Sequence, residues 1–242
     1  MAVGKQLWVV DPGNNRLTAF GPDGKMIADR TLPGRVFWVQ PTTEGRGLLL
    51  SGFFGTSSGV YHTVARLTMD KADDGFGGDV GTSRYAWVQQ HVAAETPSGE
   101  IWAVARSGGA IQILRADSLE PLASTHLPED LSQPERRGPI DISKVRPGPE
   151  VYGVTVGPDG TLWMVMFVAD AHWRTGLDRR TASVDEFWDT LLLAVSARDR
   201  AIVGARRMDQ LCLPVLSPGD ALISCTNEGA ATVDVQRLSL TR

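Results

Sequence analysis

The chain has 242 residues, 28 acidic and 24 basic, and its net charge of −4 lacks the basic excess that nucleic acid or an anionic membrane surface attracts. A composition with 42% hydrophobic and 21% charged residues is typical of a globular chain, and 26 Gly and 14 Pro disfavour long helices. The longest apolar run, residues 161–169, is shorter than the ~20 residues of a membrane-spanning helix, and no hydrophobic leader follows Met1, so we expect a cytoplasmic protein without nucleic-acid or membrane partners.

Short apolar segments recur along the chain and predict β-strands. Residues 7–10 and 162–168 are apolar at every position, as expected for strands covered on both faces. The runs at 7–10 and 162–168 are predicted second strands of their units, and third strands are predicted at 16–20, 61–67, 110–115, 191–196 and 231–235. Outer, more polar strands are predicted at 25–31, 120–126 and 201–207.

One phrase, a turn with Gly followed by an apolar residue and Trp, repeats within these units. Residues 97–104 (PSGEIWAV) match residues 158–165 (PDGTLWMV), and residues 4–10 carry the same phrase with one extra residue. Weaker copies stand at 218–223 and 45–50. Spacings of about 40 to 60 residues are those of propeller blades. We therefore predict one all-β domain, residues 1–242, folded as a five-bladed β-propeller, with a truncated or six-bladed ring as alternatives.

The predicted blades follow one another along the chain. Their approximate ranges are 4–32, 35–90, 91–127, 151–208 and 210–242. The first is predicted to begin at its second strand, and the last to end after about three strands. The repeat can be assigned in more than one way around residues 70–96. Here we predict that 84–90 closes the second blade and that 91–96 opens the third.

Two stretches resemble known propeller families. Residues 7–17, followed by 21–25, resemble an NHL repeat, and residues 152–163 resemble a blade of the SMP-30/gluconolactonase group and of virginiamycin B lyase-type propellers. The resemblance implies a β-propeller fold, because these motifs specify blade architecture. It also implies two chemistries: a divalent cation held by Glu, Asn and Asp in the gluconolactonase group, and a catalytic His and Glu with magnesium in the lyases.

Long insertions indicate which face of such a propeller carries function. Residues 53–59, 128–150 and 170–189 fall on the face where second strands end, whereas 70–83 is assigned to the opposite face. Residues 183–191 could form a short helix with a capping box from Ser183 and Glu186. The insertion from residue 170 mixes aromatic and cationic side chains, as recognition surfaces do. The predicted binding residues are Tyr152, Arg106, Trp173, Arg174 and Trp188.

Oxygen-bearing side chains after predicted second strands are candidate ligands for a divalent cation, Mg²⁺ or Ca²⁺. They are Asp11, Asn14, Asp170 and Asn227, and the candidate acid/base residues are His91 and His172. The four His lack the spacing of a structural zinc site. Two functions follow: a module that binds a small molecule or peptide on the loop-rich face, or a metal-dependent lyase or hydrolase. The first is favoured, and whether the chain is an enzyme stays open.

The two cysteines flank a turn at residues 217–220. A symmetric hairpin makes Cys212 and Cys225 direct cross-strand neighbours, which permits a disulfide on a close pair. For a chain without an export signal we favour two buried free thiols.

Overall fold

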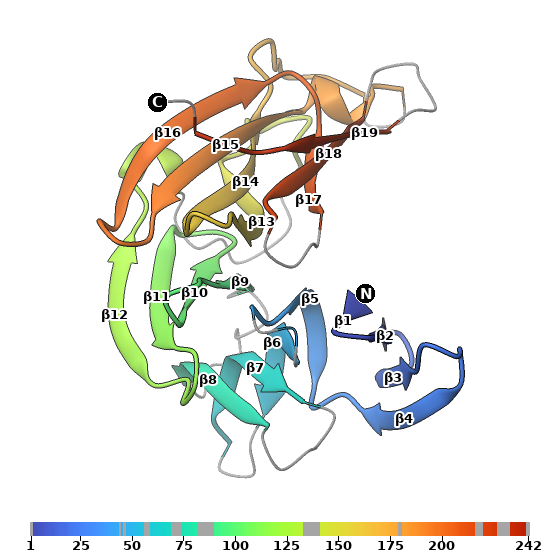
Figure 1. Ribbon diagram of the computed structural model, residues 1–242. Coiled ribbons are helices and arrows are strands. Elements are labelled where there is room, and N and C mark those ends of the chain that lie inside the picture. Colours follow the sequence, from blue (N-terminus) through green and yellow to red (C-terminus); the bar gives the residue numbers. More distant parts are fainter. Residues whose placement is uncertain are drawn as a thin grey trace. The chain divides into compact units, whose positions relative to one another are not determined.

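Five antiparallel β-sheets follow one another along the chain (Figure 1). The computed structural model describes residues 2–43, 45, 47–55, 59–68, 74–81, 90–132, 141–178, 181–215, 220–226 and 233–240. In each sheet the strands are hydrogen-bonded in chain order. These sheets are the five blades of a β-propeller, which confirms the predicted all-β fold class.

In the part of the chain that the structure describes, blades one to four have four strands each, and blade five has three. The strands of blades one and two are β1 (Ala2–Val3), β2 (Gln6–Asp11), β3 (Arg16–Phe20), β4 (Met26–Thr31), β5 (Arg35–Pro41), β6 (Leu48–Gly55), β7 (Tyr61–Leu67) and β8 (Gly75–Gly81). Those of blade three are β9 (His91–Glu95), β10 (Glu100–Ala105), β11 (Ala110–Arg115) and β12 (Pro121–His126). Those of blades four and five are β13 (Glu150–Val156), β14 (Thr161–Ala169), β15 (Trp188–Ser196), β16 (Ala201–Met208), β17 (Cys212–Val215), β18 (Leu222–Thr226) and β19 (Val233–Arg237).

Three predicted boundaries are corrected. Blade one carries a first strand, the two-residue β1, rather than beginning at its second strand. The outer strand of blade two is β8, paired with β7; residues 84–89 of the predicted strand lie outside the described residues, and much of the predicted 70–83 insertion is β8 itself. The predicted helix at 183–191 is reduced to a 3-10 turn, Val184–Glu186, because β15 already begins at Trp188 and pairs with β14.

The repeated phrase forms the turn between the first two strands of a blade. In blade three the N–H of Gly99 donates to the carbonyl of Thr96 at 3.0 Å, and in blade four Gly160 donates likewise to Gly157 at 3.0 Å. Both Gly99 and Gly160 have φ near +79°, where a residue with Cβ is strained. Gly at this position therefore sets the turn, and the apolar residues after it enter the buried second strand.

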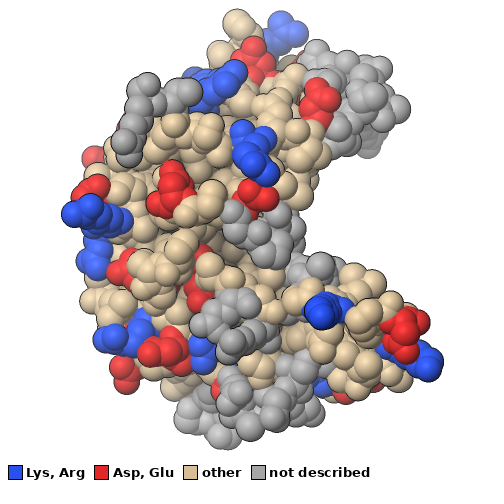
Figure 2. Space-filling model, viewed as in Figure 1, with Lys and Arg blue, Asp and Glu red and all other residues tan. Residues whose placement is uncertain are grey.

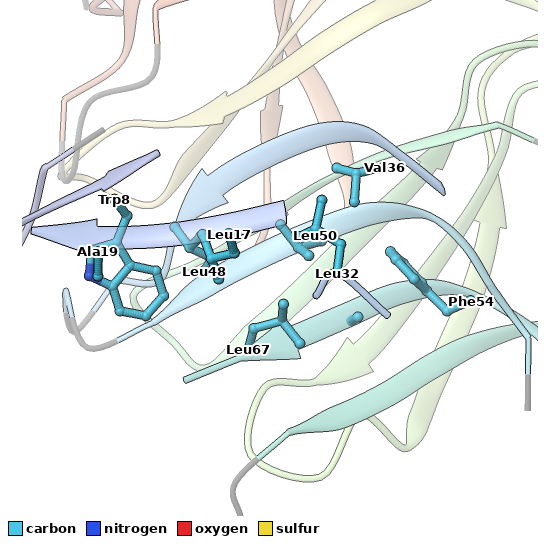
Figure 3. Close-up of a cluster of buried hydrophobic side chains, with 10 residues drawn as sticks. Trp8, Leu17, Ala19, Leu32, Val36, Leu48, Leu50, Phe54 and Leu67 are labelled. Carbon is cyan, nitrogen blue, oxygen red and sulfur yellow. The ribbon is translucent and has the colours of Figure 1, made fainter. Parts of the chain in front are cut away.

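The chain divides into two compact units, each described by itself. The first comprises residues up to 105 together with 111–125, and the second comprises 106–110, 126–215 and the residues from 220 onward. In the first unit, an apolar cluster joins blades one and two (Figure 3). Trp8 of β2, Leu17 of β3 and Phe54 of β6 are each at most 1% exposed within it.

Burial differs between the two runs that are apolar at every position. In β14, Leu162 to Met166 are fully or nearly fully buried, as predicted for a strand covered on both faces. In β2 only Trp8 is buried, whereas Leu7 and Val9 are 50% and 43% exposed. The expectation of two covered faces is therefore wrong for β2.

The two cysteines lie in blade five. The pairing of β17 with β18 places Cys212 opposite Cys225, as the symmetric hairpin predicts. The two residues form a disulfide, and both are fully buried. The expectation of free thiols is therefore wrong.

Within the described residues, no helix has the length and apolarity to cross a membrane.

Candidate functional site

Two long insertions of the second unit meet at one end of blade four. One joins β12 to β13 and the other joins β14 to β15. The indole N–H of Trp173 donates to the carbonyl of Ile142 at 3.0 Å, and the N–H of Gly176 donates to the carbonyl of Ser143 at 2.7 Å. The predicted binding residue Trp173 therefore ties the two insertions together.

Three aromatic rings lie in a row across the strands at this end of blade four. Tyr152 of β13 stacks on Phe167 of β14 with ring centroids 4.4 Å apart and planes 23° apart. The Phe167 centroid lies 6.2 Å from that of Trp188 at the start of β15. The 6.2 Å separation falls in the range of favourable aromatic pairs, and the 4.4 Å separation lies at its short end. We name these rings, together with Arg106 and Glu150, the blade-four aromatic site.

A β-bulge presents Tyr152. Val151 pairs with Met166 and Gly153 with Val165, so Tyr152 is the extra residue on β13. Its side chain is 38% exposed, although Val151 and Gly153 on either side are buried. Bulges re-aim single side chains in this way and are frequent beside functional sites.

An ion pair lies beside the rings. The Arg106 guanidinium donates from Nη2 to Glu150 Oε1 at 2.9 Å, and its central carbon lies 5.2 Å from the Tyr152 ring centroid. The backbone positions this arginine, because the carbonyl of Arg106 accepts the N–H of Val151 at 2.8 Å. The Arg106 and Glu150 side chains are 26% and 37% exposed. The site thus offers apolar rings, guanidinium donors and carboxylate acceptors within one sheet end.

A separate, polar pocket of about 390 Å³ lies against the β14–β15 insertion. Three predicted residues line it: Asp170, His172 and Arg174. The backbone N–H of His172 donates to Asp170 Oδ1 at 2.6 Å. The other residues that line this pocket are Ala171, Leu177, Asp185, Glu186 and Asp209. Glu186 fulfils its predicted capping role, since its carboxylate accepts the N–H of Ser183 at 2.9 Å.

Next to this pocket lies a buried carboxyl that the sequence reading missed. Asp189 is fully buried, and its Oδ2 accepts Arg207 Nε at 2.6 Å and the N–H of Ala171 at 3.2 Å. Its Oδ1 has no hydrogen-bond partner among the described residues. Burial raises the pKa of Asp189 and the nearby Asp170 carboxyl raises it further, against the opposing effect of Arg207. An acidic residue two positions before the apolar run 191–195 was the available signal.

A shared cation site of the four predicted ligands stays a prediction. Asp11 accepts hydrogen bonds from the Asn14 backbone at 3.1 Å and from the Asn14 side chain at 2.6 Å, which lowers the pKa of Asp11. These contacts close a turn. Asp170 belongs to the other unit, and Asn227 lies outside the described residues. Across the described ranges, no group of three or more His, Cys, Asp or Glu side chains that could hold a metal ion is present.

The two candidate acid/base histidines occupy different settings. His91 is the first residue of β9, the strand that opens blade three as predicted, and is 4% exposed opposite Ala105. His172 is exposed at the polar pocket. Their catalytic roles stay predictions. Arg106, Tyr152 and Trp188 are the predicted binding residues that come together, while their neighbours Glu150 and Phe167 were missed.

On the face shown in Figure 2, acidic and basic side chains are interspersed. The described part of that face therefore carries no large patch of one sign.

No protein-family model and no curated protein matches the sequence. Among solved structures, hydrazine synthase from Kuenenia stuttgartiensis is similar, with a TM-score of 0.51 and 13% identity over 99% of this chain and 64% of that one. A dihydro-heme d1 dehydrogenase has a TM-score of 0.47 and 12% identity over 97% of this chain and 52% of its own. Virginiamycin B lyase from Staphylococcus aureus has a TM-score of 0.49 and 12% identity over 100% of this chain and 84% of that one. The chain thus spans less than two thirds of the first two structures, and at these identities the likeness concerns the fold alone, that of a β-propeller.

Proposed function

We propose that this β-propeller is a ligand-binding module that recognises a small molecule or a peptide at the blade-four aromatic site. The observation that carries the proposal is the row formed by Tyr152, Phe167 and Trp188 beside the Arg106–Glu150 ion pair. Aromatic side chains and arginine are the residues that contribute most to binding energy at protein interfaces. Their presence at the end of a rigid sheet supports recognition at this place.

The chemistry of the site suggests the kind of ligand. Tyr152 offers a partly exposed ring, which favours an aromatic or flat apolar group. Arg106 supplies N–H donors and Glu150 supplies carboxylate acceptors, and both are partly exposed. A ligand with a hydrogen-bond donor and an acceptor next to an aromatic ring, such as an amide beside an aromatic side chain, has a matching group for each of Tyr152, Arg106 and Glu150.

Ligand-observed NMR with defined probes tests this proposal. The panel pairs N-acetyl amides of tryptophan and phenylalanine with the N-acetyl amides of leucine and alanine. We expect saturation transfer to the aromatic members, loss of that signal in Tyr152→Ala, and its retention in Val203→Ala. Val203 is a matched control, since it is an exposed apolar residue, 48% exposed, on the outer strand of the same blade. Equal binding by aromatic and aliphatic members, or unchanged binding in Tyr152→Ala, would overturn the proposal.

The metal-dependent lyase or hydrolase stays a prediction from the sequence. No observation on the described residues favours it, and the roles of its cation ligands and acid/base histidines stay predictions as well.

A further inference from the structure

Blade two carries a second row of three aromatic rings. Phe37 of β5 contacts Phe53 of β6 edge-to-face, with centroids 6.0 Å apart and planes at 82°. Phe53 in turn contacts Tyr61 at the start of β7, with centroids 5.9 Å apart and planes at 64°. Tyr61 is 39% exposed, and both phenylalanines are partly exposed. The guanidinium carbon of Arg35 lies 5.2 Å from the Phe37 centroid. We name these four residues the blade-two aromatic site.

The strand registers show that this site occupies the same positions as the one in blade four. Phe37 is the extra residue of a β-bulge between Val36 and Trp38, as Tyr152 is between Val151 and Gly153. The residue two before the bulge residue faces the middle ring in both blades: Arg35 pairs with Phe53, and Glu150 pairs with Phe167.

The third ring is equivalent as well. Gly55, two residues after Phe53, pairs with Tyr61, and Ala169, two residues after Phe167, pairs with Trp188. The two blades therefore share three equivalent ring positions on three strands and a bulge at the same place. Chance is a poor explanation for so many shared positions. Among the residues described in the other blades, no aromatic pair of this kind is present.

The two sites differ in charge. In blade four the equivalent of Arg35 is Glu150, and its carboxylate pairs with Arg106. In blade two the position carries a cation, and no carboxylate of the described residues lies within 4.0 Å of the exposed Arg35 guanidinium. The N–H edge of Arg35 is therefore available to a ligand, while its face lies toward the Phe37 ring.

We propose that the blade-two aromatic site is a second binding site, and that it takes an aromatic carboxylate. The ligand carboxylate would accept hydrogen bonds from Arg35, whose planar fork of donors matches a carboxylate. The ligand ring would contact Phe53 and the exposed face of Tyr61, because edge-to-face pairs leave ring surface uncovered. The inference does not depend on the function proposed for blade four, since all four residues belong to the first unit.

A fluorine NMR titration tests this site with two probes of the same shape, 6-fluoro-2-naphthoate and its neutral amide, 6-fluoro-2-naphthamide. We expect the naphthoate to bind at least about tenfold more tightly than the amide, since a guanidinium forms stronger hydrogen bonds with a charged carboxylate than with a neutral amide. Arg35→Gln should weaken naphthoate binding by a similar factor and leave the amide unchanged. Arg115→Gln is the matched control, because Arg115 is another exposed arginine of the first unit, at the end of β11.

Two further variants separate the sites. Tyr61→Ala should abolish naphthoate binding, whereas Tyr152→Ala in blade four should leave it intact. Equal affinities for naphthoate and amide, an equal loss in Arg35→Gln and Arg115→Gln, or dependence on Tyr152 in place of Tyr61 would each overturn the assignment. Because Arg35 is exposed, Arg35→Gln should keep the wild-type circular dichroism spectrum.

Discussion

The disulfide of blade five permits a quantitative prediction. Cys212 and Cys225 are separated by 13 positions, so the bond closes a loop of about 14 residues. The loop-entropy relation gives about 10 cal/mol/K for such a loop, or about 3 kcal/mol at 25 °C. Within the described residues, blade five has three strands, and its buried apolar residues include both cysteines. Reduction should therefore lower the free energy of unfolding by about 3 kcal/mol.

Urea unfolding with and without dithiothreitol measures this loss. With a slope of about 2 kcal/mol per molar urea, the midpoint should fall by roughly 1.5 M on reduction. The double variant Cys212→Ala/Cys225→Ala is the control, and its midpoint should not respond to dithiothreitol. Hydrogen exchange locates the effect: the β17–β19 amides should exchange faster on reduction, while those of β6 should not. Coincident midpoints, or alkylation of both cysteines in unreduced, denatured protein, would refute the reasoning.

Three further predictions concern packing, backbone and charge. Phe54→Ala should lower the free energy of unfolding by about 3–5 kcal/mol by urea titration, because the ring is 1% exposed between blades one and two; exposed Val203→Ala should change it by less than about 0.5 kcal/mol. Gly52→Ala should weaken naphthoate binding as well as stability, because its Cβ would lie 2.1 Å from the carbonyl oxygen of Arg35 and displace the backbone under the site; unchanged binding would contradict this. Since the pKa of Asp189 is raised above its ordinary 3.8, its contribution to stability is greatest below that value and is lost as pH rises through the folded pKa. The unfolding free energy of the wild type minus that of Asp189→Asn should therefore fall as pH rises to about 7, because only the wild type carries a carboxyl that ionises at this position. A pH-independent difference would contradict the assignment.

Local signals in the sequence predicted most strands. The Gly of each turn and the apolar run after it act within a few residues, so β10 and β14 were predicted nearly to their ends. The outer strand β8 was missed because its sequence, GFGGDVG, has low strand propensity, and pairing with β7 forms it instead. The helix at 183–191 was wrong for the same reason, since pairing with β14 competes for residues 188–191.

The candidate site could be predicted only in part. Tyr152 and Trp188 were selected by composition and position, but their contact through Phe167 depends on a strand register that no short pattern shows. The blade-two row was missed because its rings are drawn from three strands and a bulge shifts one of them out of alternation. The pairing of the cysteines followed from hairpin symmetry, whereas their oxidation state was inferred from the expected compartment, which lies outside the geometry of the chain.

The bulges in β5 and β13 have a consequence for how such sites arise. Each adds one residue to a strand while the pairs on both sides keep their partners. A single-codon insertion in an ordinary blade could therefore create the exposed aromatic position, and a single-codon deletion of Phe37 or Tyr152 could erase it without unpairing the sheet. Binding in this protein would then be a separable trait of individual blades, and duplication of a blade would copy it. One further substitution two residues before the bulge residue, where blade two has Arg35 and blade four has Glu150, would then change the ligand that the site prefers.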